Sequence, residues 1–178
     1  MGGTSAGGNL TDNVVHLARD EKLSPPLTGA LLIIPSVCGY GANKLPEPYR
    51  SRHFSLDQNE NAPILGRKEC EWFVLKHYRA DLNSHLFRTF TWPGGHAGLP
   101  PISIHACGMD PIRDDALCYE EALQEAGVKT RLYMAPGVPH GFHVAFPRLK
   151  SAERFVADTL EGLAWLLREG RGNTSFTD

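Results

Sequence analysis

A serine near the start of this sequence lies in a motif that could hold a nucleophile. Ser5 is the centre of Gly3-Thr4-Ser5-Ala6-Gly7, a G-x-S-x-G pattern typical of a sharp turn between a strand and a helix. Small residues suit such a turn, because flanking side chains would clash where the strand and the helix approach closely. Ser5 would then lie at a helix N-terminus with its hydroxyl exposed. On its own, the pentapeptide is equally typical of a disordered Gly/Ser-rich N-terminus.

An aspartate and a histidine further along the chain could complete a proton-transfer system with this serine. Asp110 closely follows the expected strand Ile102–Cys107, and His140 closely follows the expected strand Val128–Met134. Ligand and catalytic groups gather at the carboxyl ends of parallel strands. The order serine, aspartate, histidine is that of the α/β-hydrolase catalytic triad. We therefore expect Asp110 and His140 to lie with Ser5 at one end of a parallel sheet.

Other assignments of the acidic and basic residues remain open at this point. Asp110 precedes a proline and could serve only to form a turn. His143 lies three residues after His140 and could be the base instead. Asp114 and Asp115 are expected to be a helix N-cap and a first-turn acid rather than catalytic groups.

The elements that must position these side chains alternate between apolar strands and amphipathic helices, which is typical of a parallel α/β sheet. We expect strands at Gly29–Ile34, Ile102–Cys107 and Val128–Met134. We expect helices at Ser5–Asp20, Gly66–Arg79, Asp114–Ala126 and Leu149–Arg168. Residues 36–63 are rich in Gly, Pro, Asn and Ser and are expected to form a long loop. Residues 1–170 are expected to form one partial hydrolase domain, and residues 171–178 a frayed tail.

Composition argues against several classes of protein. The 178 residues carry 18 Lys and Arg against 20 Asp and Glu, a net charge of -2 without the clustered cations of nucleic-acid binding. No apolar run approaches the roughly 18 residues of a membrane span. The histidines lack metal-ligand spacing, so no zinc site is expected. No signal peptide follows Met1, which favours the cytoplasm, where the four cysteines would be reduced and partly buried.

These blocks together resemble the α/β-hydrolase fold, and specifically the hormone-sensitive-lipase-like family of carboxylesterases (α/β hydrolase fold-3). The resemblance rests on residues 3–9, 99–101, 108–114 and 140–143. It implies that Ser5 is the nucleophile, Asp110 the acid and His140 the general base. The backbone N–H of Ala6 would help to stabilise an oxyanion. The resemblance further implies a small-molecule ester substrate of small to medium acyl length, an acyl-enzyme, and no metal or organic cofactor. Because relatives often pair through their last strand and helix, a homodimer stays open.

Parts of the family pattern are missing from this sequence. No H-G-G-G-type oxyanion loop precedes Ser5, and Met1–Thr4 is shorter than a strand of about 5–6 residues. We therefore expect no strand before Ser5, and an unpaired edge on the strand Gly29–Ile34. The chain is expected to be the C-terminal part of a hydrolase, truncated and severely impaired or inactive alone. The alternatives are a catalytically dead remnant, a small-molecule-binding module and a serine peptidase of the same fold.

Overall fold

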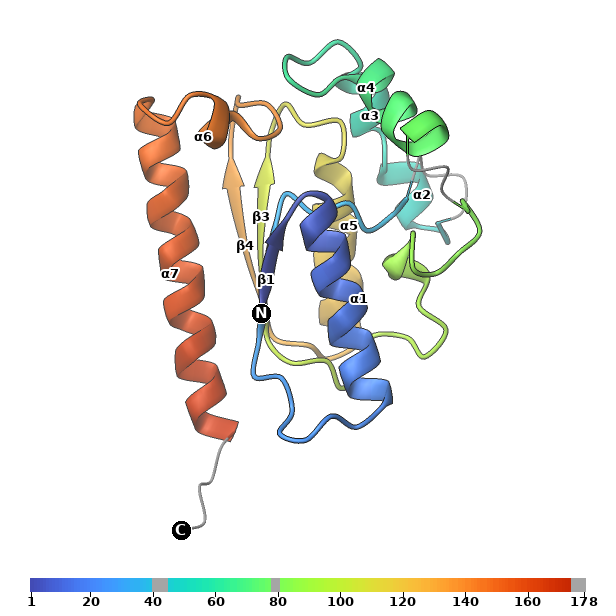
Figure 1. Ribbon diagram of the computed structural model, residues 1–178, viewed down its shortest axis with the longest axis vertical. Coiled ribbons are helices and arrows are strands. Elements are labelled where there is room, and N and C mark those ends of the chain that lie inside the picture. The colour runs from blue at the N-terminus through green and yellow to red at the C-terminus, as the bar shows by residue number, and fades with distance from the viewer. Residues whose placement is uncertain (40–44, 78–80, 174–178) are drawn as a thin grey trace.

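The computed structural model describes residues 1–39, 45–77 and 81–173. The chain folds into three layers, with a parallel sheet between two layers of helices (Figure 1). The described residues form four strands in the order β1-β2-β3-β4, and all neighbours are parallel. The strands are β1 (Gly2–Thr4), β2 (Ala30–Ile33), β3 (Ile102–Cys107) and β4 (Thr130–Ala135). The expected α/β class is confirmed, and β3 has the same bounds as the strand expected there from the sequence.

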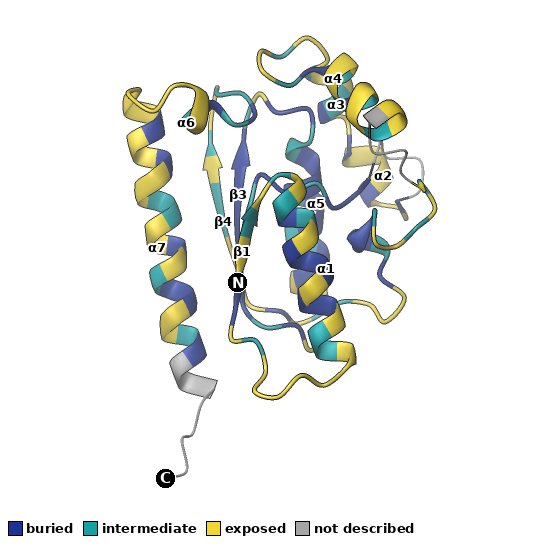
Figure 2. Ribbon diagram, viewed as in Figure 1, coloured by how far each residue is buried: buried dark blue, intermediate teal, exposed yellow. Residues whose placement is uncertain are grey.

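The main helices cover both faces of this sheet. One face is covered by α7 (Lys150–Asn173), and the other by α1 (Ala6–Asp20) and α5 (Arg113–Glu125) (Figure 1). A buried cluster containing Leu32, Ile104 and Tyr119 lies between the sheet and the pair α1 and α5. A smaller cluster containing Cys107 and Phe155 lies beneath α7. Because both faces are covered, every residue of β3 is buried (Figure 2).

The strand before Ser5 corrects an expectation. Gly2–Thr4 forms β1, which pairs in parallel with Leu31–Ile33 of β2. The amino group of Met1 also donates a hydrogen bond to the carbonyl of Gly29 at 3.0 Å. Three residues suffice because β2 supplies the partner backbone, so no apolar pattern of their own is needed. Strand β2 is consequently paired on both sides, and the open edge belongs to β1.

The helices follow the expected positions with some corrected bounds. Helix α5 ends before Gly127, whose φ of 77° is the left-handed conformation that closes a helix with little strain in glycine. Helix α7 extends past the expected end at Arg168 to Asn173, so the first residues assigned to a frayed tail continue the helix. Residues 174–178 of that tail lie outside the described residues.

The loop expected at residues 36–63 contains short helices. These are α2 (Tyr49–Arg52) and α3 (Ser55–Gln58), which carry too few residues to show a helical period in sequence. The helix expected at residues 66–79 consists of α4 (Arg67–Glu71) followed by a π-helical segment, Trp72–His77. Residues 78 and 79 of the expected helix lie outside the described residues. A single 3-10 turn, Thr89–Thr91, lies in the next loop.

A buried polar contact joins α1 to α5 within the larger core. The hydroxyl of Tyr119 donates a hydrogen bond to Oδ1 of Asp12 at 2.9 Å, and neither side chain is exposed. Burial penalises the ionised carboxylate and raises the pKa of Asp12 to about 7. Asp12 therefore holds a proton more tightly in the fold than an aspartate in water does.

Two smaller findings bear on the compositional expectations. Cysteines 38, 70, 107 and 118 are free and buried, as expected. Among the helices that the structure describes, none is both long and apolar enough to cross a lipid bilayer.

Candidate active site

Ser5 sits in a strained turn between β1 and α1. Its φ of 56° and ψ of -117° are rare for a residue with a side chain, and its N–H donates to the carbonyl of Ile33 at 2.8 Å. A Cβ atom on Gly3 would lie 2.1 Å from the carbonyl oxygen of Gly7, so only glycine fits there. Gly7 differs, because a Cβ on it would meet no described atom within 4 Å apart from its chain neighbours and the adjacent backbone of α1. The steric reason expected for both glycines of the motif therefore holds for Gly3 alone.

The structure brings the three predicted residues together in one chain of hydrogen bonds. Nε2 of His140 lies 2.9 Å from Oγ of Ser5, and Nδ1 of His140 lies 2.6 Å from Oδ2 of Asp110. The bonding fits a ring that donates its Nδ1–H to the carboxylate and accepts the serine hydroxyl at Nε2. Asp110 and His140 are buried, whereas Ser5 is partly exposed. In this arrangement the imidazole can accept the hydroxyl proton while the carboxylate stabilises the resulting cation.

Asp110 also has the turn-forming role that its neighbouring proline suggested. Its Oδ1 accepts the N–H of Ile112 at 2.9 Å, and its carbonyl accepts the N–H of Arg113 at 3.0 Å. These bonds close the turn between β3 and α5 and leave Oδ2 for His140. The two interpretations of Asp110 are therefore compatible.

His143, the alternative base, has different surroundings. Its ring stacks on Phe155 with centroids 4.4 Å apart, and its Nδ1 is buried without a hydrogen-bond partner among the described residues. Burial lowers its pKa. It is His140, three residues earlier, that contacts Ser5.

Asp114 and Asp115 lie in the first turn of α5, and their oxygens bind backbone outside this helix. Oδ2 of Asp114 accepts the N–H groups of Phe54 and Ser55 at 2.8 and 2.7 Å. Oδ2 of Asp115 accepts the N–H groups of Val37 and Cys38 at 2.9 and 2.8 Å. The pair therefore fastens the segment after β2 to α5, which the sequence did not reveal because these partners are far apart in the chain.

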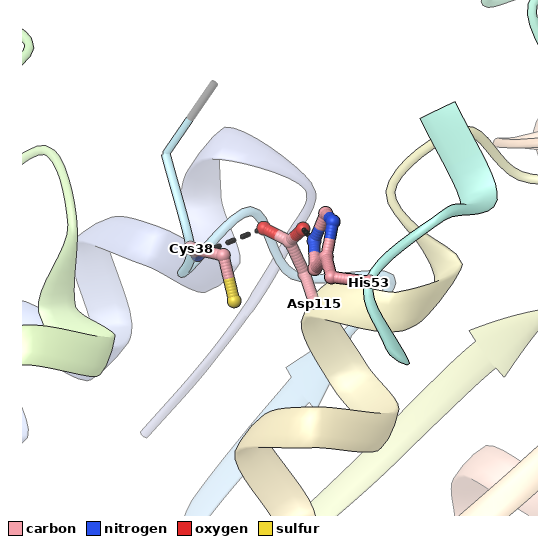
Figure 3. A group of neighbouring side chains, drawn as sticks. All are labelled: Cys38, His53 and Asp115. Atoms are coloured by element: carbon pink, nitrogen blue, oxygen red, sulfur yellow. Dashed lines mark hydrogen bonds and ion pairs between the residues drawn. The ribbon is translucent and has the colours of Figure 1, made fainter. Parts of the chain in front are cut away.

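Cys38, His53 and Asp115 form the one described cluster with the donor types of a metal site (Figure 3). One donor atom from each lies within 4.8 Å of the others, and all three residues are buried. However, Oδ1 of Asp115 already binds Nε2 of His53 at 2.7 Å, and its other oxygen binds two N–H groups. Burial and the neighbouring carboxylates raise the pKa of the Cys38 thiol well above its usual range. These donor atoms are thus either hydrogen-bonded to one another or protonated. The cluster holds Val37, Cys38 and His53 against Asp115 of α5.

His53 itself gave no signal in the sequence, since it stands alone in a Gly- and Pro-rich stretch. Burial opposes its protonation, but the hydrogen bond to Asp115 and the nearby carboxylates outweigh burial and raise its pKa. The resulting contact is a buried hydrogen bond that holds residues 53–55 against α5.

The surroundings of Ser5 offer one further polar group. Ala6 is the first residue of α1, so its backbone N–H is among those that no carbonyl within the helix can accept. Helix N-termini stabilise negative charge, and this one begins directly after Ser5. A hollow of about 360 Å³ is elsewhere, at the opposite end of α1, where Arg19 and Pro101 help to line it.

Comparisons with known proteins find relatives of this chain. A family model described as the alpha/beta hydrolase fold matches residues 1–144. A protein of the AB hydrolase superfamily from Schizosaccharomyces pombe is 38% identical over 94% of this chain and 48% of its own length. A versiconal hemiacetal acetate esterase from Dothistroma septosporum is 32% identical over 97% of this chain and 52% of its own length.

Solved structures give the same result. The crystal structure of vibralactone cyclase superposes with a TM-score of 0.87 at 42% identity, covering 95% of this chain and 49% of the other. The chain spans about half the length of the curated relatives that it matches. The match over residues 1–144, the parallel sheet and the turn at Ser5 agree, and the chain belongs to the alpha/beta hydrolase fold family.

Proposed function

We propose that this chain carries the catalytic residues of a serine carboxylic-ester hydrolase that works through an acyl-enzyme. The observation that carries the proposal is the unbroken chain of hydrogen bonds from Ser5 through His140 to Asp110. A buried carboxylate, an imidazole and a partly exposed hydroxyl in this order are what proton-assisted attack by serine requires. The name of the relative from Dothistroma septosporum, an acetate esterase, supports an ester as the substrate class.

In the proposed reaction, His140 Nε2 takes the hydroxyl proton as Oγ of Ser5 bonds to the ester carbonyl carbon. Asp110 holds the ring in the correct tautomer and stabilises its positive charge. The tetrahedral intermediate then breaks its bond to the alcohol oxygen, and His140 returns the proton to the leaving alcohol. Water, deprotonated by His140, then attacks the acyl carbon. The bond from that carbon to Oγ of Ser5 breaks, His140 returns the proton to Oγ, and the carboxylic acid leaves. The residues involved need no metal ion or organic cofactor for these steps.

Charge on the carbonyl oxygen would be stabilised by the N–H of Ala6 and the N-terminus of α1. Removing one oxyanion donor typically lowers kcat by about 10²–10³. Since only one donor is assigned here, slow turnover of small to medium acyl esters by this chain is the expected outcome.

Two measurements on the purified chain test the proposal. The first is hydrolysis of p-nitrophenyl butyrate, and the second is covalent labelling by a fluorophosphonate, which reports an activated serine even when turnover is slow. The Ser5→Ala variant should lose both. Ser51→Ala is a matched control, because Ser51 is an exposed serine whose hydroxyl, among the described residues, bonds the carbonyl of Pro48 alone. Equal labelling and equal hydrolysis by the wild type and Ser5→Ala would refute the proposal for this chain and favour a remnant that binds without reacting.

A further inference from the structure

We propose that Asn59 is a positioning residue for Asp110 and acts through the main chain of residues 108–112, the turn between β3 and α5, which we call the acid loop. The inference rests on the proposed function, since it concerns how the acid of that site is held. Nδ2 of Asn59 donates a hydrogen bond to the backbone carbonyl of Asp110 at 3.0 Å. The two residues are 51 positions apart, so this bond joins separate segments of the chain.

Asp110 is fixed at four other points, and three of them come from its own turn. Its N–H donates to the carbonyl of Cys107 at 3.3 Å, and its carbonyl and Oδ1 accept the N–H groups of Arg113 and Ile112. The fourth is the bond to His140, the residue that Asp110 has to orient, so this bond cannot itself be what holds Asp110 in position. Asn59 is therefore the side chain among the described residues that ties this carbonyl to a part of the fold outside the turn.

Asn59 can act as a tether because the segment that carries it is itself anchored. Residues 53–59, which we call the strap, contact the start of α5 at several points. Ser55 Oγ donates to the carbonyl of Pro111 at 2.9 Å, and its N–H and that of Phe54 bind Asp114. His53 binds Asp115 at 2.7 Å. The strap is thus held along the acid loop and the start of α5 by these hydrogen bonds, and Asn59 is its last residue.

The consequence for the reaction is geometric. The contact between Asp110 and His140 is 2.6 Å long, and such charge-assisted bonds weaken quickly when the partners shift. Without Asn59, the carbonyl of Asp110 keeps, among the bonds to described residues, the one from the N–H of Arg113 within the turn. The carboxylate would then sample positions in which it orients the His140 ring less well. Loss of one neutral hydrogen bond should lower kcat about two- to tenfold and leave KM unchanged, because Asn59 supports Asp110 and not the substrate.

The test compares Asn59→Ala and Asn59→Asp with Asn61→Ala in the full chain. Asn61 is two residues away and exposed, and within the described part of the chain its amide binds the neighbouring Glu60 alone. Asn59→Asp keeps the shape of the side chain but turns an acceptor toward the Asp110 carbonyl, so it covers the case in which the alanine variant folds poorly. The readouts are kcat and KM for p-nitrophenyl butyrate, and the proton NMR resonance of His140 Nδ1–H, which reports the bond to Asp110 without turnover.

Support for the proposal is a two- to tenfold lower kcat at constant KM in both Asn59 variants, together with an upfield or broadened Nδ1–H resonance. Asn61→Ala should match the wild type in both. The proposal is overturned if the Asn59 variants keep a wild-type resonance, or if KM rises while kcat stays constant. Failure of the proposed function looks different, because the wild type would then neither hydrolyse the ester nor label at Ser5, while the resonance would still report on Asn59.

Discussion

The turn at Ser5 makes a quantitative prediction, because two glycines of one motif have opposite surroundings. In Gly3→Ala, the added Cβ would lie 2.1 Å from the carbonyl oxygen and 2.4 Å from the carbonyl carbon of Gly7, and 2.8 Å from Thr11 Oγ1. The nearest of these atoms are backbone at the start of α1, which cannot rotate away. The helix would have to retreat from β1 by about 1 Å, because interiors are packed too closely to absorb the overlap.

That displacement has two costs. Overpacking of a well-packed site costs typically about 1–3 kcal/mol, and contact with backbone puts Gly3→Ala near the upper end. Ser5 lies between β1 and α1, and a shift of about 1 Å in a reacting group can cost roughly 10² in rate. Gly7→Ala is the matched control, because its Cβ meets no described atom within 4 Å beyond its chain neighbours and the adjacent backbone of α1. Alanine also favours a helix over glycine by up to about 1 kcal/mol.

Urea unfolding of the two variants gives the free energies, and the rate of fluorophosphonate labelling gives the reactivity of Ser5. We expect Gly3→Ala to lose about 3 kcal/mol and nearly all labelling, whereas Gly7→Ala equals or exceeds the wild type in stability. A Gly3→Ala variant with wild-type stability and labelling would refute the steric reasoning. So would a Gly7→Ala variant that loses as much stability as Gly3→Ala.

Two further predictions concern buried carboxylates. The pKa of Asp12 is about 7 in the fold against 3.8 in a free side chain, so its stabilising effect is complete below pH 4 and is lost as the pH rises through 7. The stability of Asp12→Asn relative to the wild type should therefore rise between pH 4 and pH 8, by up to roughly 4 kcal/mol in urea titrations. Burial lowers the pKa of His16 to about 4, which makes the fold more stable as the pH rises, but this effect is present in both proteins and largely cancels in the comparison. A stability difference between Asp12→Asn and the wild type that does not change with pH would contradict the raised pKa of Asp12. Asp115→Ala should lower the free energy of unfolding by about 3–5 kcal/mol, because it leaves His53 and two buried backbone N–H groups without their hydrogen-bond partner. Glu161→Ala, which removes an exposed ion pair with Arg131, should lower it by less than about 1 kcal/mol. Equal losses in the two variants would contradict the role of Asp115 in holding these segments together.

Elements with a strong pattern of their own could be predicted from the sequence, and elements made by pairing could not. Ile102, Ile104 and Ala106 alternate with Ser103, His105 and Cys107 between Pro101 and Gly108, and the structure has β3 at the same residues, Ile102–Cys107. Gly2–Thr4 has no such pattern and is a strand only because β2 offers it a partner. Propensity within one segment carries no information about that partner.

The candidate site divides in the same way. The positions of Ser5, Asp110 and His140 were predictable because each follows a strand or a motif, and the structure brings them into contact. The supports around them were not predictable. His53 meets Asp115 across 62 positions and Asn59 meets Asp110 across 51, and nothing in the local sequence of any of these residues indicates the pairing.

The position of the site on the sheet has a consequence for how the protein loses reactivity. Ser5 follows one edge strand and His140 follows the other, and their hydrogen bond joins residues 135 positions apart. Edge strands open locally with smaller free energies than the centre of a sheet. Fraying at either border therefore separates the hydroxyl from the imidazole while β2, β3 and the long helices stay intact. In mild denaturant, fluorophosphonate labelling of Ser5 should therefore be lost before the circular dichroism of the helices changes. Loss of labelling then marks the first step of unfolding rather than the last.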